Sequence, residues 1–372
     1  MASNTIQYKA LVVESPGNLS VKDTQLPQPD RGDVVIRVLS SYVNTNSNDV
    51  LVKGQPFLPG SDRPHVWGCL AVGRVEATGG DEVQLKKGDL VACDNLLRAR
   101  DAPDVEAIQG LFYKFSPESK KLMNTYKDGF YAECANVPLE SLHVLNEDLL
   151  LNQLGYQIQD LPQILYLAVG MGGLRKIGLK AGETVVIAPA TGKFSGNAVA
   201  MASALGATVV AASRDKTVLD QLAKHIPRVH TLQLQGDVQK DAEAMQQWGA
   251  PDVFVDFSPT SAGMPSHITS GIQALRPNGR VCFLGAPQGN VEIPYGMAFF
   301  KGLTFTFSFM YSRQDFQQVV RMAESGVLQL GAKGGQKFIP YKLHDWKQAF
   351  EDAEKHSKWG NIVSFVFNEA EK

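Results

Sequence analysis

Short apolar segments separated by turn residues characterise the first part of the chain. Each segment is bounded by glycine, aspartate or lysine, which are typical of the turns between short strands. These strand-like segments are 34–38, 68–75, 90–93 and 129–137. Their spacing predicts a β-rich domain over residues 1–155, with the polar segment 94–128 as a surface excursion.

The pattern changes to alternating strands and helices after about residue 160. Two continuous apolar runs, 184–188 and 208–212, have the character of strands buried on both faces of a parallel sheet. The alanine-rich stretch 197–205 between them predicts a helix, and Asp215 is suited to cap the next one. This alternation predicts a Rossmann-type parallel sheet over residues 156–305.

The remaining segment, residues 306–372, is expected to complete the first domain. The chain enters this segment through an alternating stretch, in which polar or small residues separate Leu303, Phe305, Phe307 and Phe309. Such alternation is typical of a strand, and we expect this strand to return the chain to the β-rich domain. The fold class predicted is therefore α/β, with a parallel-sheet domain and a β-rich domain.

Composition and charge exclude several kinds of protein. Lysine and arginine number 36 against 38 aspartates and glutamates, a net charge of −2 that argues against a nucleic-acid partner. The four cysteines form no CxxC pair, so neither a cysteine metal cluster nor a disulfide framework is expected. No apolar run approaches the length of about 18 residues that a membrane span requires. The N-terminus lacks a signal-peptide pattern, so we expect a cytoplasmic protein with no membrane partner.

The turn after the first buried strand carries the strongest functional signal. Residues 189–196 read PATGKFSG and lead directly into the predicted helix. A dinucleotide site needs a tight turn, a close backbone approach and free amides at a helix N-terminus. Ala190 and Ser195 stand where two glycines of a GxGxxG pattern would be, so a plain strand–helix turn is the alternative.

The residues at the end of the second buried strand should determine whether the protein binds NADP(H) or NAD(H). Ser213 and Arg214 have the chemistry to bind a 2′-phosphate, whereas an acidic side chain would bind the free ribose hydroxyls of NAD(H). We therefore predict NADP(H). Asp215 leaves an alternative open, because it either caps the following helix or favours NAD(H).

Several landmarks together resemble the medium-chain dehydrogenase/reductase family over nearly the whole chain. They are Gly88-Asp89-Leu90-Val91, Gly129-Phe130-Tyr131-Ala132-Glu133 and Lys180-Ala181-Gly182-Glu183-Thr184-Val185. The loop APATGKFSG and the segment 98–101 look like a fungal branch usually labelled zinc-type alcohol dehydrogenase. The resemblance implies a GroES-like catalytic domain beside the Rossmann domain, a small-molecule substrate and a homodimer.

The sequence differs from that family at the positions of its zinc ligands. Zinc members have a cysteine near position 46, a histidine in a Gly-His-Glu segment and a later cysteine or acid. Here the first position is Asn46, the second segment reads Gly68-Cys69-Leu70, and no cysteine lies between Cys134 and Cys282. Since zinc requires three protein ligands, we expect a zinc-free member with no metal site.

Loss of zinc changes the expected chemistry. Zinc-free relatives are typically quinone or enoyl reductases, some of fungal secondary metabolism, and an activated C=C accepts hydride without a Lewis acid. The resemblance therefore implies NADPH-dependent reduction of an enone, enoyl or quinone-like substrate. A carbonyl or alcohol oxidoreductase using a side-chain acid stays open, as does a non-redox cyclase or NADP(H)-binding protein.

The candidate residues fall into a catalytic and a cofactor-binding group. Asn46, Trp67, Cys69 and Tyr311 are the catalytic candidates, although each has an ordinary structural reading as a cap, a core residue or a packed ring. The cofactor-binding candidates lie on the glycine-containing turn and on the ends of later strands. They are Thr191, Gly192, Lys193, Phe194, Ser195, Ser213, Arg214, Phe257, Ser258, Gly285, Ala286 and Asn361.

Overall fold

The chain divides into two compact units, and each is described by itself. The computed structural model describes residues 5–26, 28–55, 58–60, 62–263, 265–287 and 289–368. The first unit contains Met1–Pro162, Lys337–Ser357 and Asn361–Lys372. The second unit contains Gln163–Gln336 and Lys358–Gly360.

The first unit is built mainly from antiparallel strands. A sheet of order β2-β1-β4 combines β1 (Ile6–Ser15), β2 (Asn18–Leu26) and β4 (His65–Val66). The larger sheet has the order β11-β6-β5-β3-β19-β18, with β10 also paired to β3. Its strands are β3 (Asp33–Tyr42), β5 (Ala71–Thr78), β6 (Leu90–Cys93), β10 (Cys134–Pro138), β11 (Leu142–Val144), β18 (Lys337–Tyr341) and β19 (Asn361–Val366).

Aromatic rings fill the core of the first unit. Tyr131 packs edge-on against Phe365, with ring centroids 5.1 Å apart, and lies 5.9 Å from Phe350. Phe350 belongs to α9 (Trp346–Lys355), so this helix is fixed to the sheet by its apolar face. All three rings are fully buried, which makes this cluster the centre of the unit.

The predicted excursion 94–128 has its own structure. It forms a small sheet of order β7-β8-β9 followed by a helix. The elements are β7 (Leu96–Arg98), β8 (Glu106–Ile108), β9 (Phe112–Tyr113) and α1 (Pro117–Thr125). Ser116 caps α1, with its side chain accepting a hydrogen bond from the Ser119 amide, so a polar sequence still forms regular elements here.

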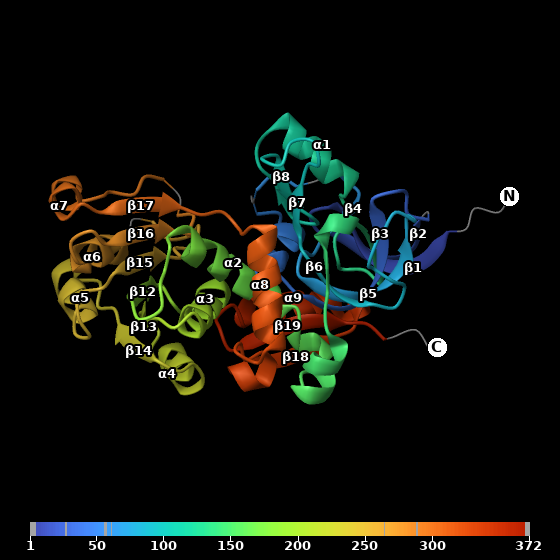
Figure 1. The fold of residues 1–372 in the computed structure, drawn as a ribbon. Coiled ribbons are helices and arrows are strands. Elements are labelled where there is room, and N and C mark those ends of the chain that lie inside the picture. Colours follow the sequence, from blue (N-terminus) through green and yellow to red (C-terminus); the bar gives the residue numbers. More distant parts are fainter. Residues whose placement is uncertain are drawn as a thin grey trace. The chain divides into compact units, whose positions relative to one another are not determined.

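The second unit is a six-stranded parallel sheet, and its fold class confirms the prediction. The strand order is β14-β13-β12-β15-β16-β17, and Figure 1 labels the strands in this spatial order. The strands are β12 (Thr184–Ala188), β13 (Thr208–Ser213), β14 (Val229–Gln233), β15 (Val253–Asp256), β16 (Arg280–Phe283) and β17 (Thr304–Phe307). The helices are α2 (Gln163–Lys176), α3 (Lys193–Ala204), α4 (Lys216–His225), α5 (Val238–Met245), α6 (Ser266–Ala274), α7 (Tyr295–Lys301) and α8 (Arg313–Glu324).

The sheet is covered as the apolar runs predict. Val186, Val210 and Phe254 share a core with Ala242 and Met245 of α5, and residues of α6 pack into the same cluster. Helices α2 and α3 contact each other, and both contact strands of the sheet. Burial on both faces explains why these strands read as continuous apolar runs rather than as alternating ones.

The second unit extends beyond the predicted boundary at residue 305. Strand β17 pairs in parallel with β16 and does not return the chain to the first unit. Phe307 stacks on Phe283 with ring centroids 4.9 Å apart, which fixes β17 at the edge of the parallel sheet. The chain rejoins the first unit at Lys337, and β18 and β19 are the strands that complete it. The alternation of aromatic residues at 303–309 indicated a strand correctly but did not identify its partner.

No helix among the described residues combines the length and apolar character needed to cross a membrane.

Candidate functional site

The glycine-containing turn lies at the carboxyl end of β12 and begins α3. The amide of Ala190 donates to the carbonyl of Ala212 at 2.9 Å, and the hydroxyls of Thr191 and Ser213 lie 2.8 Å apart. Gly192 precedes the first residue of α3, and its amide donates to Ser195 Oγ at 3.0 Å. Ser195 therefore closes the turn by a hydrogen bond at the position where a glycine is usual.

Lys193 and Phe194 follow the turn but have different surroundings. Lys193 is the first residue of α3 and only 7% exposed, and burial lowers the pKa of its ammonium group to about 7. Phe194 is 43% exposed and packs edge-on against Tyr166 of α2, with ring centroids 4.8 Å apart. The free amides of a helix N-terminus suit an anionic ligand, and an anion bound there would favour the charged form of Lys193.

The end of β13 holds the residues expected to select the cofactor. Ser213 is buried, and Arg214 is exposed beside it. Asp215 caps α4, because its Oδ1 accepts a hydrogen bond from the Val218 amide at 3.2 Å. Its Oδ2 is bonded to the ammonium of Lys358, and this interaction holds the pKa of the Asp215 carboxyl below its usual value.

A buried carboxylate lies where β15 ends. Asp256 Oδ1 accepts hydrogen bonds from the Ser258 amide at 3.1 Å, from Ser258 Oγ at 2.5 Å and from His267 Nε2 at 3.1 Å. The other oxygen, Oδ2, has no hydrogen-bond partner among the described residues. A Cβ on Gly285 would lie 2.5 Å from this oxygen, so a glycine is required there.

The turns after β15 and β16 are joined to each other and to β12. The amide of Phe257 donates to the carbonyl of Ala188, and the amide of Ala286 donates to the carbonyl of Ser258. Ser258 is buried, whereas Ala286 is exposed. The structure thus brings the predicted cofactor residues of four successive strands of the sheet, β13, β12, β15 and β16, to one edge.

This edge fits a nicotinamide dinucleotide. Ligands of parallel sheets bind outside the carboxyl ends of the strands, with the pyrophosphate at a helix N-terminus. A Cβ on Gly192 would meet only Ser195 Oγ, at 3.2 Å, so the backbone of the turn is open to close approach. Asn361 is the exception among the candidates, because it begins β19 in the first unit.

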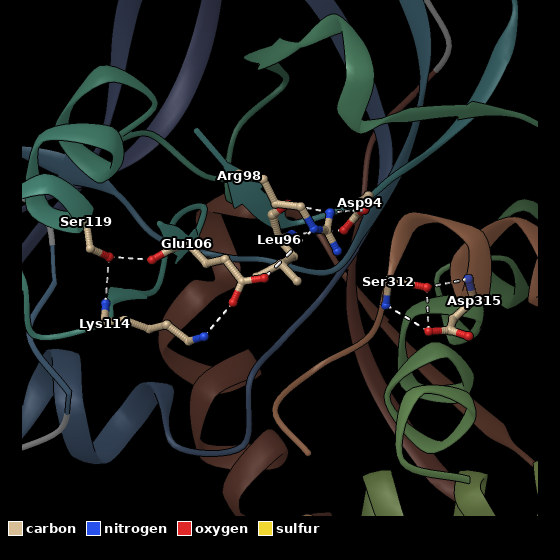
Figure 2. Close-up of polar contacts among 8 residues, drawn as sticks. All are labelled: Asp94, Leu96, Arg98, Glu106, Lys114, Ser119, Ser312 and Asp315. Atoms are coloured by element: carbon tan, nitrogen blue, oxygen red, sulfur yellow. Dashed lines mark hydrogen bonds and ion pairs between the residues drawn. The ribbon is translucent and has the colours of Figure 1, made fainter. Parts of the chain in front are cut away.

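Tyr311 lies in the second unit, two residues before the first residue of α8. Its ring is 5% exposed and packs against Phe316 at 5.6 Å between ring centroids. Figure 2 shows how the following residue is fixed: Ser312 Oγ donates to Asp315 Oδ2 at 2.6 Å and accepts from the Asp315 amide at 3.1 Å. This capping box holds the backbone that carries Tyr311.

Cys69 in the first unit is held by amide side chains. Asn44 Nδ2 lies 3.5 Å from the Cys69 sulfur, and Asn95 also forms a side-chain hydrogen bond with it. Burial raises the pKa of the thiol to about 11. Sequence reasoning missed both asparagines, although Asn44 lies only two positions from the candidate Asn46.

The other catalytic candidates of the first unit, Asn46 and Trp67, lie near Cys69 in the sequence and have contacts of their own. Asn46 is half-buried, and its carbonyl accepts from the Val50 amide at 3.0 Å in the single turn Asn48–Val52. Asp49 in that turn pairs with Lys53 at 2.8 Å. Trp67 is 3% exposed, with its ring edge against Tyr131. Asp49 therefore has a structural partner, and Trp67 is part of the core.

A buried tyrosine lies beside these residues and was not predicted as a site residue. Tyr131 Oη accepts a hydrogen bond from the Asn44 amide at 2.8 Å and lies 3.1 Å from Ser47 Oγ. Its ring covers Gly68, where a Cβ would lie 2.4 Å from the ring and where φ is +103°. No other residue type fits that position, which explains the glycine next to Cys69.

The residues present do not fit the zinc site of zinc dehydrogenases. Within the described ranges, no three histidine, cysteine, aspartate or glutamate side chains gather in a way that would hold a metal ion. His65 is buried, and its Nδ1 has no hydrogen-bond partner among those residues. Burial lowers the pKa of His65 to about 4.

The segment after Cys93 carries a separate polar network, shown in Figure 2. Arg98 donates to Asp94 Oδ2 at 3.1 Å and to the Leu96 carbonyl at 3.2 Å, and the Asp94 side chain is 1% exposed. Lys114 is paired with Glu106 on the adjacent strand. Asn95, which is bonded to Cys69, lies inside this fixed segment.

Two family models match this chain. The alcohol dehydrogenase GroES-like domain matches residues 30–147, and the zinc-binding dehydrogenase domain matches residues 196–325. The chain belongs to the medium-chain dehydrogenase/reductase family. It is an oxidoreductase of that type, with a fold that combines a Rossmann-type sheet and a GroES-like unit.

Individual relatives of the family are distant. L-threonine 3-dehydrogenase of Pyrococcus horikoshii is 24% identical and covers 95% of this chain and 97% of that protein. Acryloyl-coenzyme A reductase of Metallosphaera sedula is 28% identical, over 59% of this chain and 63% of that protein. The cobalt- and zinc-bound thermostable alcohol dehydrogenase of Pyrobaculum aerophilum superimposes with a TM-score of 0.75 and 21% identity, over 97% of this chain and 100% of that one.

Proposed function

We propose that this protein is a zinc-independent, NADP(H)-dependent reductase of activated C=C bonds, such as those of enones, enoyl compounds or quinones. The observation that carries the proposal is the environment of Cys69. Its sulfur is buried and hydrogen-bonded to Asn44, and among the described residues it belongs to no group of three histidine, cysteine, aspartate or glutamate side chains that could hold a metal ion. With no three-ligand set among the described residues, hydride acceptance is assigned to a substrate that is already conjugated.

The choice of NADP(H) over NAD(H) rests on the end of β13. Asp215 caps α4 with one oxygen and binds Lys358 with the other, so both oxygens already accept a hydrogen bond within the protein. Ser213 and Arg214 precede it, and Arg214 supplies planar donors that match a phosphate. These residues support a 2′-phosphate site.

The nicotinamide would supply the hydride, and the residues of this chain would bind the cofactor and orient the substrate. Thr191, Gly192 and Lys193 at the start of α3 are proposed to hold the pyrophosphate. Asn46 is proposed to orient the substrate, with Cys69 and Trp67 as part of its surroundings. Tyr311 Oη is proposed as the donor that returns a proton after hydride transfer, with solvent as the alternative.

The acryloyl-coenzyme A reductase relative supports C=C chemistry, since its name describes reduction of an activated alkene. The L-threonine 3-dehydrogenase relative and the alcohol dehydrogenase neighbour favour a second candidate, an alcohol or carbonyl oxidoreductase. That candidate requires a side chain to replace the Lewis acid. A screen of enones, quinones and ketones with the same enzyme separates the two.

The first experiment is a titration of the purified protein with NADPH and with NADH, followed by quenching of its four tryptophans. Zinc is measured on the same sample. Tight NADPH binding, weak NADH binding and substoichiometric zinc are expected. Stoichiometric zinc would overturn zinc independence, and equal binding of the two cofactors would overturn the NADP(H) assignment.

We also propose that the protein is a homodimer formed through the edge of the parallel sheet. Strand β17 is the last strand in the sheet order, and aromatic side chains are exposed on it and on α7. They are Tyr295, Phe299, Phe300 and Phe307, with exposed fractions of 80%, 68%, 87% and 68%. A second copy offers the same edge and the same rings, so a two-fold axis would pair strand with strand and cover the patch.

A further inference from the structure

Three residues near the end of the chain are part of the second unit. Lys358–Gly360 belong to it, whereas the residues on either side, up to Ser357 and from Asn361, belong to the first unit. Lys358 forms an antiparallel bridge with Gly192, and the Trp359 amide donates to the Thr191 carbonyl at 3.0 Å. The excursion is therefore hydrogen-bonded to the proposed pyrophosphate turn.

Packing fixes this excursion in place. Trp359 is 2% exposed, and a Cβ on Gly196 of α3 would lie 2.4 Å from its ring. The Gly360 amide donates to Gln336 Oε1 at 3.2 Å. The backbone directly after Lys358 is thus held in place, which limits the positions that the Lys358 side chain reaches.

The Lys358 side chain extends to the end of β13. Its ammonium is bonded to Asp215 Oδ2, while the Lys358 side chain remains 61% exposed. A lysine ammonium has three donors, so a bond to one carboxylate oxygen leaves capacity for an anion. Arg214, the residue before Asp215, is exposed and forms no ion pair with any described residue.

We infer that Lys358 is a specificity-determining residue for NADP(H): it neutralises Asp215 and adds a cation where the 2′-phosphate would bind. This inference rests on the proposed function, because it assigns a further residue to the same cofactor site. Without the lysine, the free Asp215 carboxylate would repel a 2′-phosphate and accept hydrogen bonds from the ribose hydroxyls of NADH. The Lys358 side chain thereby strengthens NADPH binding and weakens NADH binding at the same time.

The test is equilibrium binding by calorimetry, with NADPH and NADH and with the fragments 2′,5′-ADP and 5′-AMP. Lys358→Ala should weaken NADPH and 2′,5′-ADP about 10- to 100-fold, the range expected when a charge-assisted hydrogen bond to a phosphate is lost. Affinity for NADH and 5′-AMP should change little or increase. An equal loss for both pairs of ligands, or no loss for either, would overturn the inference.

Lys355→Ala is the matched control. Lys355 lies three positions earlier, is likewise 61% exposed and also pairs with an aspartate, Asp352. Its replacement should leave all four affinities unchanged. The melting temperature of each variant is measured first, so that a folding defect is not read as a loss of binding.

A double variant tests the neutralising role. Asparagine caps a helix as well as aspartate does, so Asp215→Asn keeps the start of α4. Adding Asp215→Asn to Lys358→Ala should recover part of the lost NADPH affinity, and no recovery would contradict neutralisation. If the unmodified protein binds NADPH no better than NADH, the proposed function fails. If it prefers NADPH and Lys358→Ala keeps that preference, only the role of Lys358 fails.

Discussion

The side-chain nitrogen of Asn44 lies 3.5 Å from the sulfur of Cys69 in the first unit. The thiol is 5% exposed, and burial raises its pKa to about 11. Only the thiolate is a strong nucleophile, so this buried and protonated cysteine is a poor nucleophile at neutral pH. The sulfur is therefore a hydrogen-bonded part of the protein interior.

The buried thiol, together with the missing three-ligand set among the described residues, predicts that neither a free thiol nor a chelatable metal supports activity. Cys69→Ser keeps the size of the side chain and its hydrogen bond, so we expect kcat/KM to change by less than about tenfold, which is roughly 1.4 kcal/mol. Dialysis against a chelator should leave the activity unchanged. A loss on dialysis that added zinc restores would contradict zinc independence.

Thiol labelling gives an independent check on the same site. All four cysteines are buried, so a water-soluble disulfide reagent should label the folded protein slowly and the urea-unfolded protein completely. Rapid labelling of one thiol in the folded protein, absent from Cys69→Ser, would show that Cys69 is reactive after all.

Replacement of Arg214 should separate the two cofactors. Arg214 is exposed at the end of β13, with its guanidinium available for a phosphate. We expect Arg214→Ala to weaken NADPH about 10- to 100-fold and NADH far less, because only NADPH carries the 2′-phosphate. Arg321→Ala, which removes an exposed arginine of α8, is the control. Equal losses for both cofactors would place Arg214 elsewhere on the dinucleotide.

The sequence predicts the elements of the cofactor edge because their signals are local. A run of five residues, of which four are buried, gives β12 its bounds, and Asp215 caps α4 in the structure as its position indicates. Lys358 could not be found in this way. It reaches Asp215 from 143 positions away, and no local pattern marks its three-residue excursion. The partner of β17 was missed for the same reason, because the pairing depends on residues of β16, such as Phe283, as well as on the strand's own Phe307.

In the first unit, the contacts that explain the site residues are even less apparent from the sequence. The sequence shows Gly68 only as part of the Gly68-Cys69-Leu70 segment, whereas the structure gives the reason for the glycine: the Tyr131 ring fills the space where a side chain would lie. Asn44 and Asn95 meet at one sulfur although 51 positions separate them in the sequence (95 − 44 = 51). The sequence drew attention to Cys69, whereas the hydrogen bonds that define its surroundings required the tertiary structure.

His65 should make the protein less stable as the pH falls. Burial lowers its pKa from the usual 6.5 to about 4, so between these values the unfolded chain binds a proton that the folded protein does not. Stability is therefore lost as the pH falls through 6.5, and by pH 5 the loss from this group is about 2 kcal/mol relative to pH 7.

Urea unfolding at pH 7 and pH 5 measures this contribution. His65→Gln, which cannot be protonated, should reduce the difference in unfolding free energy between the two pH values. His344→Gln is the control, since the side chain of His344 is 75% exposed. An unchanged pH dependence in His65→Gln would show that other groups cause the acid sensitivity.

Gly196 should be intolerant of any side chain. A Cβ there would lie 2.4 Å from Trp359 Cδ1, in a region that is already closely packed. We expect Gly196→Ala to lower the free energy of unfolding by about 1–3 kcal/mol, the usual cost of overpacking. Gly263→Ala is the control, because no atom of the described residues, chain neighbours aside, lies within 4 Å of its Cβ position. Wild-type stability in Gly196→Ala would mean that Trp359 moves without cost, and the fixed position of Lys358 would then lose its support.

The exposed edge of the parallel sheet predicts the oligomeric state. Phe307 on β17 and Phe300 on α7 are 68% and 87% exposed, which is unusual for large aromatic side chains that remain in solvent. A second copy that pairs its own β17 in the opposite direction would satisfy the free backbone groups of the edge and bury both rings.

Light scattering after size exclusion should therefore give twice the chain mass. Phe300→Asp and Phe307→Asp should each give monomers, because a buried unpaired carboxylate destabilises the contact. Val83→Asp changes an equally exposed apolar residue of the first unit, 97% exposed, and should leave the dimer intact. Monomeric wild-type protein at micromolar concentration would refute the pairing, and a dimer that survives both phenylalanine substitutions would place the interface on another surface.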